Sequence, residues 1–330
     1  MQETRLDTAR IRAARRVIDP IFLDTPLYRC EALEPVLGCA VSVKLETANP
    51  VRSFKARGTE VVANLLASDG PRAVVCASAG NLGQALAWSG RERGLDVHVV
   101  ASRFAPAAKL DRIRALGAGL ELVDGDIEPA RERAAEIARH DGIRLVEDSL
   151  DLETCEGAAT IGLELVDAAP SFDAVLIALG GGALATGVGH VMKALAPGVE
   201  VICVQPLGAP AMTHSWRRRQ VVTTGATDTI ADGVAGRRPI RAVLDDLLLV
   251  ADDAVLVEEA SIIAGMRMLL DHAGLVVEPS AALGIAAIIE DRERFAGRHV
   301  ATIVCGSNVD ADTYRRWVGA AAATLPDDRS

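Results

Sequence analysis

The stretch Ser53-Phe54-Lys55-Ala56-Arg57-Gly58 places one lysine where a turn leads into a predicted helix, and the rest of the chain can be interpreted around it. Residues 59–66 continue the helix with apolar side chains at helical spacing. At a buried helix start, desolvation and the positive end of the helix dipole both favour a neutral amine. A neutral lysine amine is a nucleophile toward carbonyl carbon. The alternative is an ordinary helix lysine whose ammonium group reaches solvent.

Short apolar strands alternate with amphipathic helices along most of the chain. We predict strands at 41–46, 73–77, 96–101, 119–123, 144–147, 174–179, 200–204, 253–257 and 299–304. This alternation predicts the α/β class with open parallel sheets. Residues 208–236 are expected to be loops with little regular structure. A helix is expected to begin at Thr160 and to end before residue 169. The tail after about Leu325 is expected to be disordered.

Composition excludes several classes of function. The chain has 330 residues, enough for two domains, and its 35 basic and 45 acidic residues give a formal net charge of −10. An acidic chain with 3% aromatic residues is a poor binder of nucleic acid or of an anionic membrane surface. Six scattered cysteines without a CxxC pair suit a reducing compartment, and no zinc motif is present. We therefore expect a cytoplasmic protein without a signal peptide or membrane span.

A run of three glycines, Gly180-Gly181-Gly182, follows a buried predicted strand and precedes a helix. Small residues let backbone N–H groups close around a phosphate, and the helix N-terminus adds a favourable partial charge. The alternative is a tight connection that needs glycine for its dihedral angles. The run is not GxGxxG, and no acidic residue follows a second strand at the right distance, so a dinucleotide site is disfavoured.

Two further motifs lie at strand ends. In Ser78-Ala79-Gly80-Asn81-Leu82, the backbone amides could hold a carboxylate and the Asn81 amide could donate to a phenolic oxygen; the alternative is a helix cap formed by Ser78 or Asn81. Cys305 ends the last strand, where a thiol is either a small buried hydrophobe or a weak hydrogen-bonding partner for a ring nitrogen. The lysine, the glycine run and these motifs occupy the positions where open α/β sheets bind ligands. Pyridoxal 5′-phosphate, linked to Lys55 as a Schiff base, would explain them together.

Several motifs, taken in order, resemble one known family. They are Ser-Phe-Lys-x-Arg-Gly, Ser-Ala-Gly-Asn-x-Gly-Gln, the glycine run, and residues 231–235, 277–281 and 305–308. Together they resemble the fold-type II pyridoxal-phosphate enzymes of the threonine/serine dehydratase and serine racemase group, over Thr25 to Asp310. The resemblance implies two open parallel-sheet α/β domains with the active site between them, and a homodimer. The large cofactor-binding domain would comprise residues 1–48 and 149–330, and the small substrate-gripping domain residues 49–148.

The resemblance also implies a role for each motif. Lys55 would hold the cofactor and later move the Cα proton, Phe54 would flank the cofactor, Asn81 would bond its 3′-oxygen, and Cys305 would face the pyridine nitrogen. The phosphate would be held by Gly180, Gly181, Gly182, Ala183 and Leu184. The substrate carboxylate would be held by the backbone of Ser78, Ala79, Gly80, Asn81 and Leu82.

The chain departs from the group's pattern at a few positions. Ala79 stands where racemases of the group carry a serine that serves as the second acid/base, so racemisation is disfavoured. Gln205 and Ala211 stand where relatives carry the carboxylates of a divalent-cation site, so we predict that no metal is bound. An unusual substrate side chain could be recognised by three charged residues, Glu156, Arg237 and Arg238. The alternative is that these are ordinary charged residues on the surface.

The predicted activity is β-elimination by a dehydratase (ammonia-lyase) that converts L-threonine, L-serine or a related 3-hydroxy amino acid to a 2-oxo acid and ammonia. One alternative is dehydration of a modified substrate, such as 3-hydroxyaspartate or an intermediate of hydroxyectoine breakdown. Others are β-replacement and racemisation. A nucleotide-binding oxidoreductase or a ligand-binding protein on a doubly wound fold is the alternative from a different class, and it leaves Lys55 unexplained.

Overall fold

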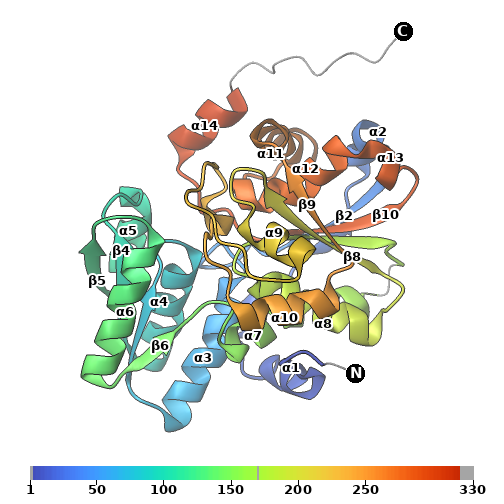
Figure 1. The fold of residues 1–330 in the computed structure, drawn as a ribbon. Helices are drawn as coiled ribbons and strands as arrows, with labels where there is room; N and C mark the ends of the chain where they lie inside the picture. Colours follow the sequence, from blue (N-terminus) through green and yellow to red (C-terminus); the bar gives the residue numbers. More distant parts are fainter. Residues whose placement is uncertain (1–2, 169–170, 320–330) are drawn as a thin grey trace.

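The computed structural model describes residues 3–168 and 171–319, and these form two α/β units with one sheet each (Figure 1). The predicted disordered tail lies outside the described residues. Figure 1 shows the smaller sheet with α4, α5 and α6 gathered at one side of the molecule, and the larger sheet with its helices at the other. Among the described residues, no helix is both long and apolar enough to cross a membrane.

The larger sheet has six strands in the order β1-β2-β10-β7-β8-β9. All neighbours are parallel except β1 and β2, and β2 and β10 pair strands from opposite ends of the chain. Every residue of β7 is buried, as expected for an apolar strand covered on both faces. The strands are β1 Leu27–Arg29, β2 Ala40–Leu45, β7 Ala174–Ala178, β8 Glu200–Pro206, β9 Asp253–Val257 and β10 His299–Val304.

Helices cover both faces of the larger sheet. Figure 1 shows α7, α8 and α10 on one face and α11 and α12 on the other. The helices of this unit are α1 Thr8–Ala14, α2 Glu34–Leu37, α7 Leu152–Asp167, α8 Ala183–Leu195, α9 Ala211–Arg218, α10 Arg241–Val250, α11 Glu259–Ala273, α12 Leu283–Glu290, α13 Arg292–Phe295 and α14 Ala311–Gly319. Short 3₁₀ helices occur at Pro20–Phe22, Glu31–Leu33, Asp232–Val234 and Pro279–Ala282.

The smaller sheet has four parallel strands in the order β5-β4-β3-β6. Its strands are β3 Ala73–Ala77, β4 Asp96–Ser102, β5 Gly119–Val123 and β6 Arg144–Val146. Its helices are α4 Asn81–Arg93, α5 Ala107–Ala115 and α6 Ile127–Asp141, and α3 Lys55–Asp69 packs against both α4 and α7. The predicted α/β class with parallel sheets is therefore confirmed.

Two local predictions were wrong. Residues 208–236 contain α9, in which Ala211, Met212 and Ser215 are buried while Arg217 is turned outward, an amphipathic pattern too short to stand out from its Gly- and Arg-rich surroundings. Helix α7 begins at Leu152 rather than at Thr160. Its first turns consist largely of small and polar residues, which the packing against α3 and α8 buries.

Candidate active site

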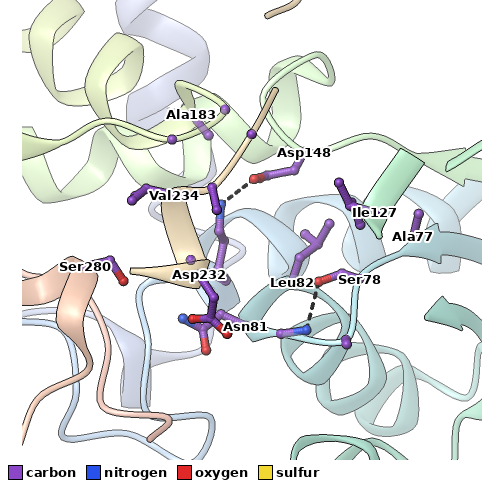
Figure 2. A pocket seen from close by; sticks show the side chains of 18 of the residues that line it. Ala77, Ser78, Asn81, Leu82, Ile127, Asp148, Ala183, Asp232, Val234 and Ser280 are labelled. Carbon is purple, nitrogen blue, oxygen red and sulfur yellow. Dashed lines mark hydrogen bonds and ion pairs between the residues drawn. The ribbon is translucent and has the colours of Figure 1, made fainter. Parts of the chain in front are cut away.

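A cavity of about 620 Å³ is lined by residues of both sheet units (Figure 2). It lies at the carboxyl ends of strands, where parallel sheets bind ligands. It is lined by all the residues that the sequence assigned to the cofactor and to the substrate carboxylate: Phe54, Lys55, Ser78, Ala79, Gly80, Asn81, Leu82, Gly180, Gly181, Gly182, Ala183, Leu184 and Cys305. Segments far apart in the chain therefore meet around one space.

Lys55 is the first residue of α3, and the backbone beside it is tied to the end of β10. The Phe54 amide donates to the Cys305 carbonyl at 3.1 Å, and Ser53 forms an isolated β-bridge with Gly306. Lys55 Nζ lies 4.6 Å from the centre of the Phe54 ring and 2.5 Å from Asp148 Oδ2. The prediction of a neutral lysine amine therefore omitted a carboxylate that contacts it.

A buried charge network lies behind Lys55. The Arg57 side chain is 0% exposed, and its guanidinium binds Glu46 at 2.8 Å and Glu164 at 2.5 Å. Lys44 Nζ, also buried, lies 2.5 Å from Glu164. Burial alone would raise the pKa of Glu164, but the hydrogen bond and charge of Arg57, with Lys44, lower it to about 2. The network anchors the first turn of α3, which carries Lys55, to β2 and α7.

The glycine run forms a cradle at the start of α8. Gly182 is the N-cap, with φ +113°, and as a glycine it has no side chain of its own to cap the helix. A Cβ on Gly181 would lie 2.6 Å from Ser149 Oγ, and one on Gly182 would lie 2.5 Å from Val243 Cγ1. Ser149 Oγ accepts a hydrogen bond from the Ala183 amide at 3.1 Å. A helix N-terminus whose N-cap is a glycine, next to a loop without side chains, fits a phosphate group.

Asn81 is held by groups from the other unit. Its Nδ2 donates to Glu278 Oε1 at 2.8 Å, and its Oδ1 accepts from Asn308 Nδ2 at 2.7 Å. The N-cap of α4 is Gly80, whose amide donates to Ser78 Oγ at 3.1 Å, so neither Ser78 nor Asn81 is the cap. The Asn81 side chain is therefore fixed at the cavity wall.

Two buried titratable groups close this side of the cavity. Burial raises the pKa of the Glu278 carboxyl. The Oε2 atom of Glu278 accepts a hydrogen bond from the backbone N–H of Asn308 at 3.1 Å. Burial raises the pKa of the Cys305 thiol far above its usual range, with Glu278 adding to the effect and Lys55 opposing it. Cys305 is therefore a neutral S–H group at neutral pH, available as a weak hydrogen-bonding partner.

The three candidates for recognition of a substrate side chain are separated by the fold. Arg238 lines the cavity, with Nη1 3.7 Å from Glu128. Arg237 pairs with Asp126, and Glu156 pairs with Arg10 at 2.6 Å. Neither Arg237 nor Glu156 is among the described residues that line the cavity.

Sequence reasoning missed Asp148 and the role of Glu278. Asp148 directly follows the predicted strand 144–147, so the rule that selected the other strand-end residues could also have found it. Glu278 belongs to the motif at residues 277–281. Its contact with Asn81 joins residues 197 positions apart, so only the folded structure reveals it.

Comparisons with known proteins agree with this geometry. Residues 18–306 match the model of the family described as pyridoxal-phosphate dependent enzyme. The chain is 32% identical to an L-threonine ammonia-lyase of Thermotoga maritima, over 93% of this chain and 77% of that protein. It is also 32% identical to a phenylserine dehydratase of Ralstonia pickettii, over 95% and 96% of the two chains.

Solved structures show the same fold. The processed form of threonine deaminase isoform 2 from Solanum lycopersicum superimposes with a TM-score of 0.85 at 28% identity, over 96% of this chain and 90% of that one. A maize serine racemase gives a TM-score of 0.87 at 27% identity, over 94% and 98%. The fold class and the pyridoxal 5′-phosphate cofactor expected from the resemblance are thus confirmed, and the chain belongs to the family of pyridoxal-phosphate-dependent enzymes.

Proposed function

We propose that the protein is a dehydratase (ammonia-lyase) that converts L-threonine, L-serine or a related 3-hydroxy amino acid to a 2-oxo acid and ammonia by β-elimination. One observation carries the proposal: Lys55, the glycine run and the residue 78–82 loop line a single cavity. The similar proteins named threonine ammonia-lyase and phenylserine dehydratase support it.

The cofactor fits the residues of the cavity. The glycine run, Ala183 and Leu184 would hold its phosphate at the start of α8. Phe54, Asn81 and Cys305 would contact its ring, its 3′-oxygen and its ring nitrogen. Bound pyridoxal phosphate withdraws electrons from the substrate Cα and makes the Cα proton acidic. A neutral Cys305 thiol, unlike an aspartate, would not keep the ring nitrogen protonated.

The chain's own residues then supply binding and proton transfer. Backbone N–H groups of residues 78–82 clamp the substrate carboxylate at the start of α4. Lys55 Nζ removes the Cα proton, and the β-hydroxyl leaves as water. Ala79 has no proton to exchange on the opposite face, which favours elimination over racemisation.

Contacts between the two sheet units lie around the cavity. Lys109 of α5, which lines it, pairs with Asp232 of the 3₁₀ helix on the other unit. Arg112 Nη1 of α5 donates to Asn308 Oδ1 at 2.8 Å. We propose that these contacts limit the entry of water while the substrate is bound.

The domain boundaries at 48/49 and 148/149, the homodimer and the cytoplasmic location are also proposals. The strands β3 to β6, all within 49–148, form one sheet, which supports the boundaries. The family resemblance supports the dimer, and light scattering of the purified protein would test it.

The activity is tested with purified protein and a panel of L-threonine, L-serine, 3-phenylserine and 3-hydroxyaspartate, read by release of 2-oxo acid. We expect release with at least one of them, and loss of release in Lys55→Ala. Borohydride reduction followed by peptide mapping should find the cofactor on Lys55. An unmodified Lys55, or chiral inversion without 2-oxo acid, would contradict the proposal.

A further inference from the structure

Asp148 is the carboxylate that the proposed chemistry leaves without a role. It lies two residues after the end of β6 and lines the cavity beside the glycine run (Figure 2). Its Oδ2 lies 2.5 Å from Lys55 Nζ, and the two side chains are 25% and 17% exposed. Its other oxygen, Oδ1, is buried and has no hydrogen-bond partner among the described residues.

The other ionisable groups around Lys55 do not offer a comparable contact. Cys305, at the end of β10, is a neutral thiol because burial raises its pKa far above the usual range. Glu278, before the 3₁₀ helix at Pro279, is hydrogen-bonded to Asn81 and to the Asn308 amide. At the mouth of the cavity, Asp232 pairs with Lys109.

The remaining cavity carboxylate, Asp126, also has a partner of its own, since Arg237 binds it. Within the part of the chain that the structure describes, Asp148 is thus the carboxylate that contacts the Lys55 nitrogen. A contact this short places the negative charge of the carboxylate directly beside the nitrogen.

We propose that Asp148 is the positioning residue of Lys55: its carboxylate fixes the Lys55 nitrogen and stabilises the positive charge that this nitrogen gains with a proton. The proposal deepens the proposed function and rests on it. When the Cα–H bond breaks, its electron pair stays with carbon and the proton goes to Lys55 Nζ. When the C–O bond breaks, the oxygen keeps the bonding pair, takes this proton and leaves as water. Asp148 takes no part in the proton transfer itself, and its carboxylate supplies the counter-charge.

The test compares the holoenzymes of Asp148→Asn, Asp148→Glu and Glu147→Gln. Glu147→Gln is the matched control, because it removes the neighbouring carboxylate, which is not among the described residues lining the cavity. The visible absorption of the bound cofactor depends on whether the Lys55 nitrogen attached to it carries a proton, so a pH titration of this absorption needs no amino-acid substrate. Circular dichroism first verifies that each variant is folded.

We expect the midpoint of the titration to move to lower pH by about one unit or more in Asp148→Asn, because the protonated nitrogen loses its counter-charge. Asp148→Glu should restore most of the parental midpoint, and Glu147→Gln should keep it. With the best substrate of the panel, Asp148→Asn should lower kcat by about 10- to 100-fold with little change in KM.

An unchanged midpoint in folded Asp148→Asn overturns the proposal, and so does a shifted midpoint with unchanged kcat. Should Asp148→Asn not fold, the same titration of Asp148→Ser decides. The two failures are distinguishable: if no substrate releases 2-oxo acid, the proposed function fails, while the titration still reports whether Asp148 acts on Lys55.

Discussion

Replacing Arg57 by Met tests whether the buried charge network holds the first turn of α3. The guanidinium is 0% exposed and binds Glu46 at 2.8 Å, Glu164 at 2.5 Å and Thr160 Oγ1 at 3.0 Å. Methionine leaves Glu46 and Glu164 buried with one cation remaining in the network, Lys44, which binds Glu164. Removing one partner of a buried ion pair costs about 3–5 kcal/mol, and 4 kcal/mol is roughly a thousandfold in the folding equilibrium. Urea unfolding of the apoenzyme, followed by circular dichroism, measures this loss.

Two further variants make the result specific. Arg91→Met removes a guanidinium that is 49% exposed and pairs with Glu92, so it should cost less than about 1 kcal/mol. Arg57→Met combined with Glu46→Gln returns the network to one positive and one negative charge, so the pair should cost less than the sum of the single changes. A loss in Arg57→Met no larger than in Arg91→Met would refute the reasoning.

Two other predictions concern acid stability and the glycine cradle. The pKa of Glu164 is lowered from 4.5 to about 2 in the folded protein, so the stabilisation by its carboxylate is present above about pH 4.5 and is lost as the pH falls toward 2. Glu164→Gln should therefore flatten the fall of the unfolding free energy over this pH range. An equally steep fall in the variant would contradict the assignment. Gly181→Ala puts a Cβ 2.6 Å from Ser149 Oγ and should weaken cofactor binding at least about tenfold in an absorbance titration. The control Gly198→Ala, whose added Cβ would have nothing within 4 Å, should leave the affinity unchanged. Equal affinities of the two variants for the cofactor would count against the phosphate cradle.

The sequence was informative wherever a residue's role follows from its position at a strand end. The glycine run, Asn81 and Cys305 each follow a predicted strand, and all of them line the same cavity. Parallel α/β units place the carboxyl ends of their strands together, so strand-end motifs converge without any knowledge of the packing. The short amphipathic helix α9 was missed because eight residues carry too little periodicity to outweigh a Gly- and Arg-rich composition.

The motif order and the strand pattern by themselves determined the class of fold, the cofactor and the lysine expected to bind it, because these depend on local periodicity and on residue types that few other chemistries require. Which charges meet was decided only by the tertiary structure. Asp148 against Lys55, Arg57 between Glu46 and Glu164, and Glu278 against Asn81 join segments distant in the chain. A carboxylate has the same appearance in a sequence whether it is solvated or paired. Its energy is set by burial and by its nearest opposite charge, and both are decided only when the chain folds.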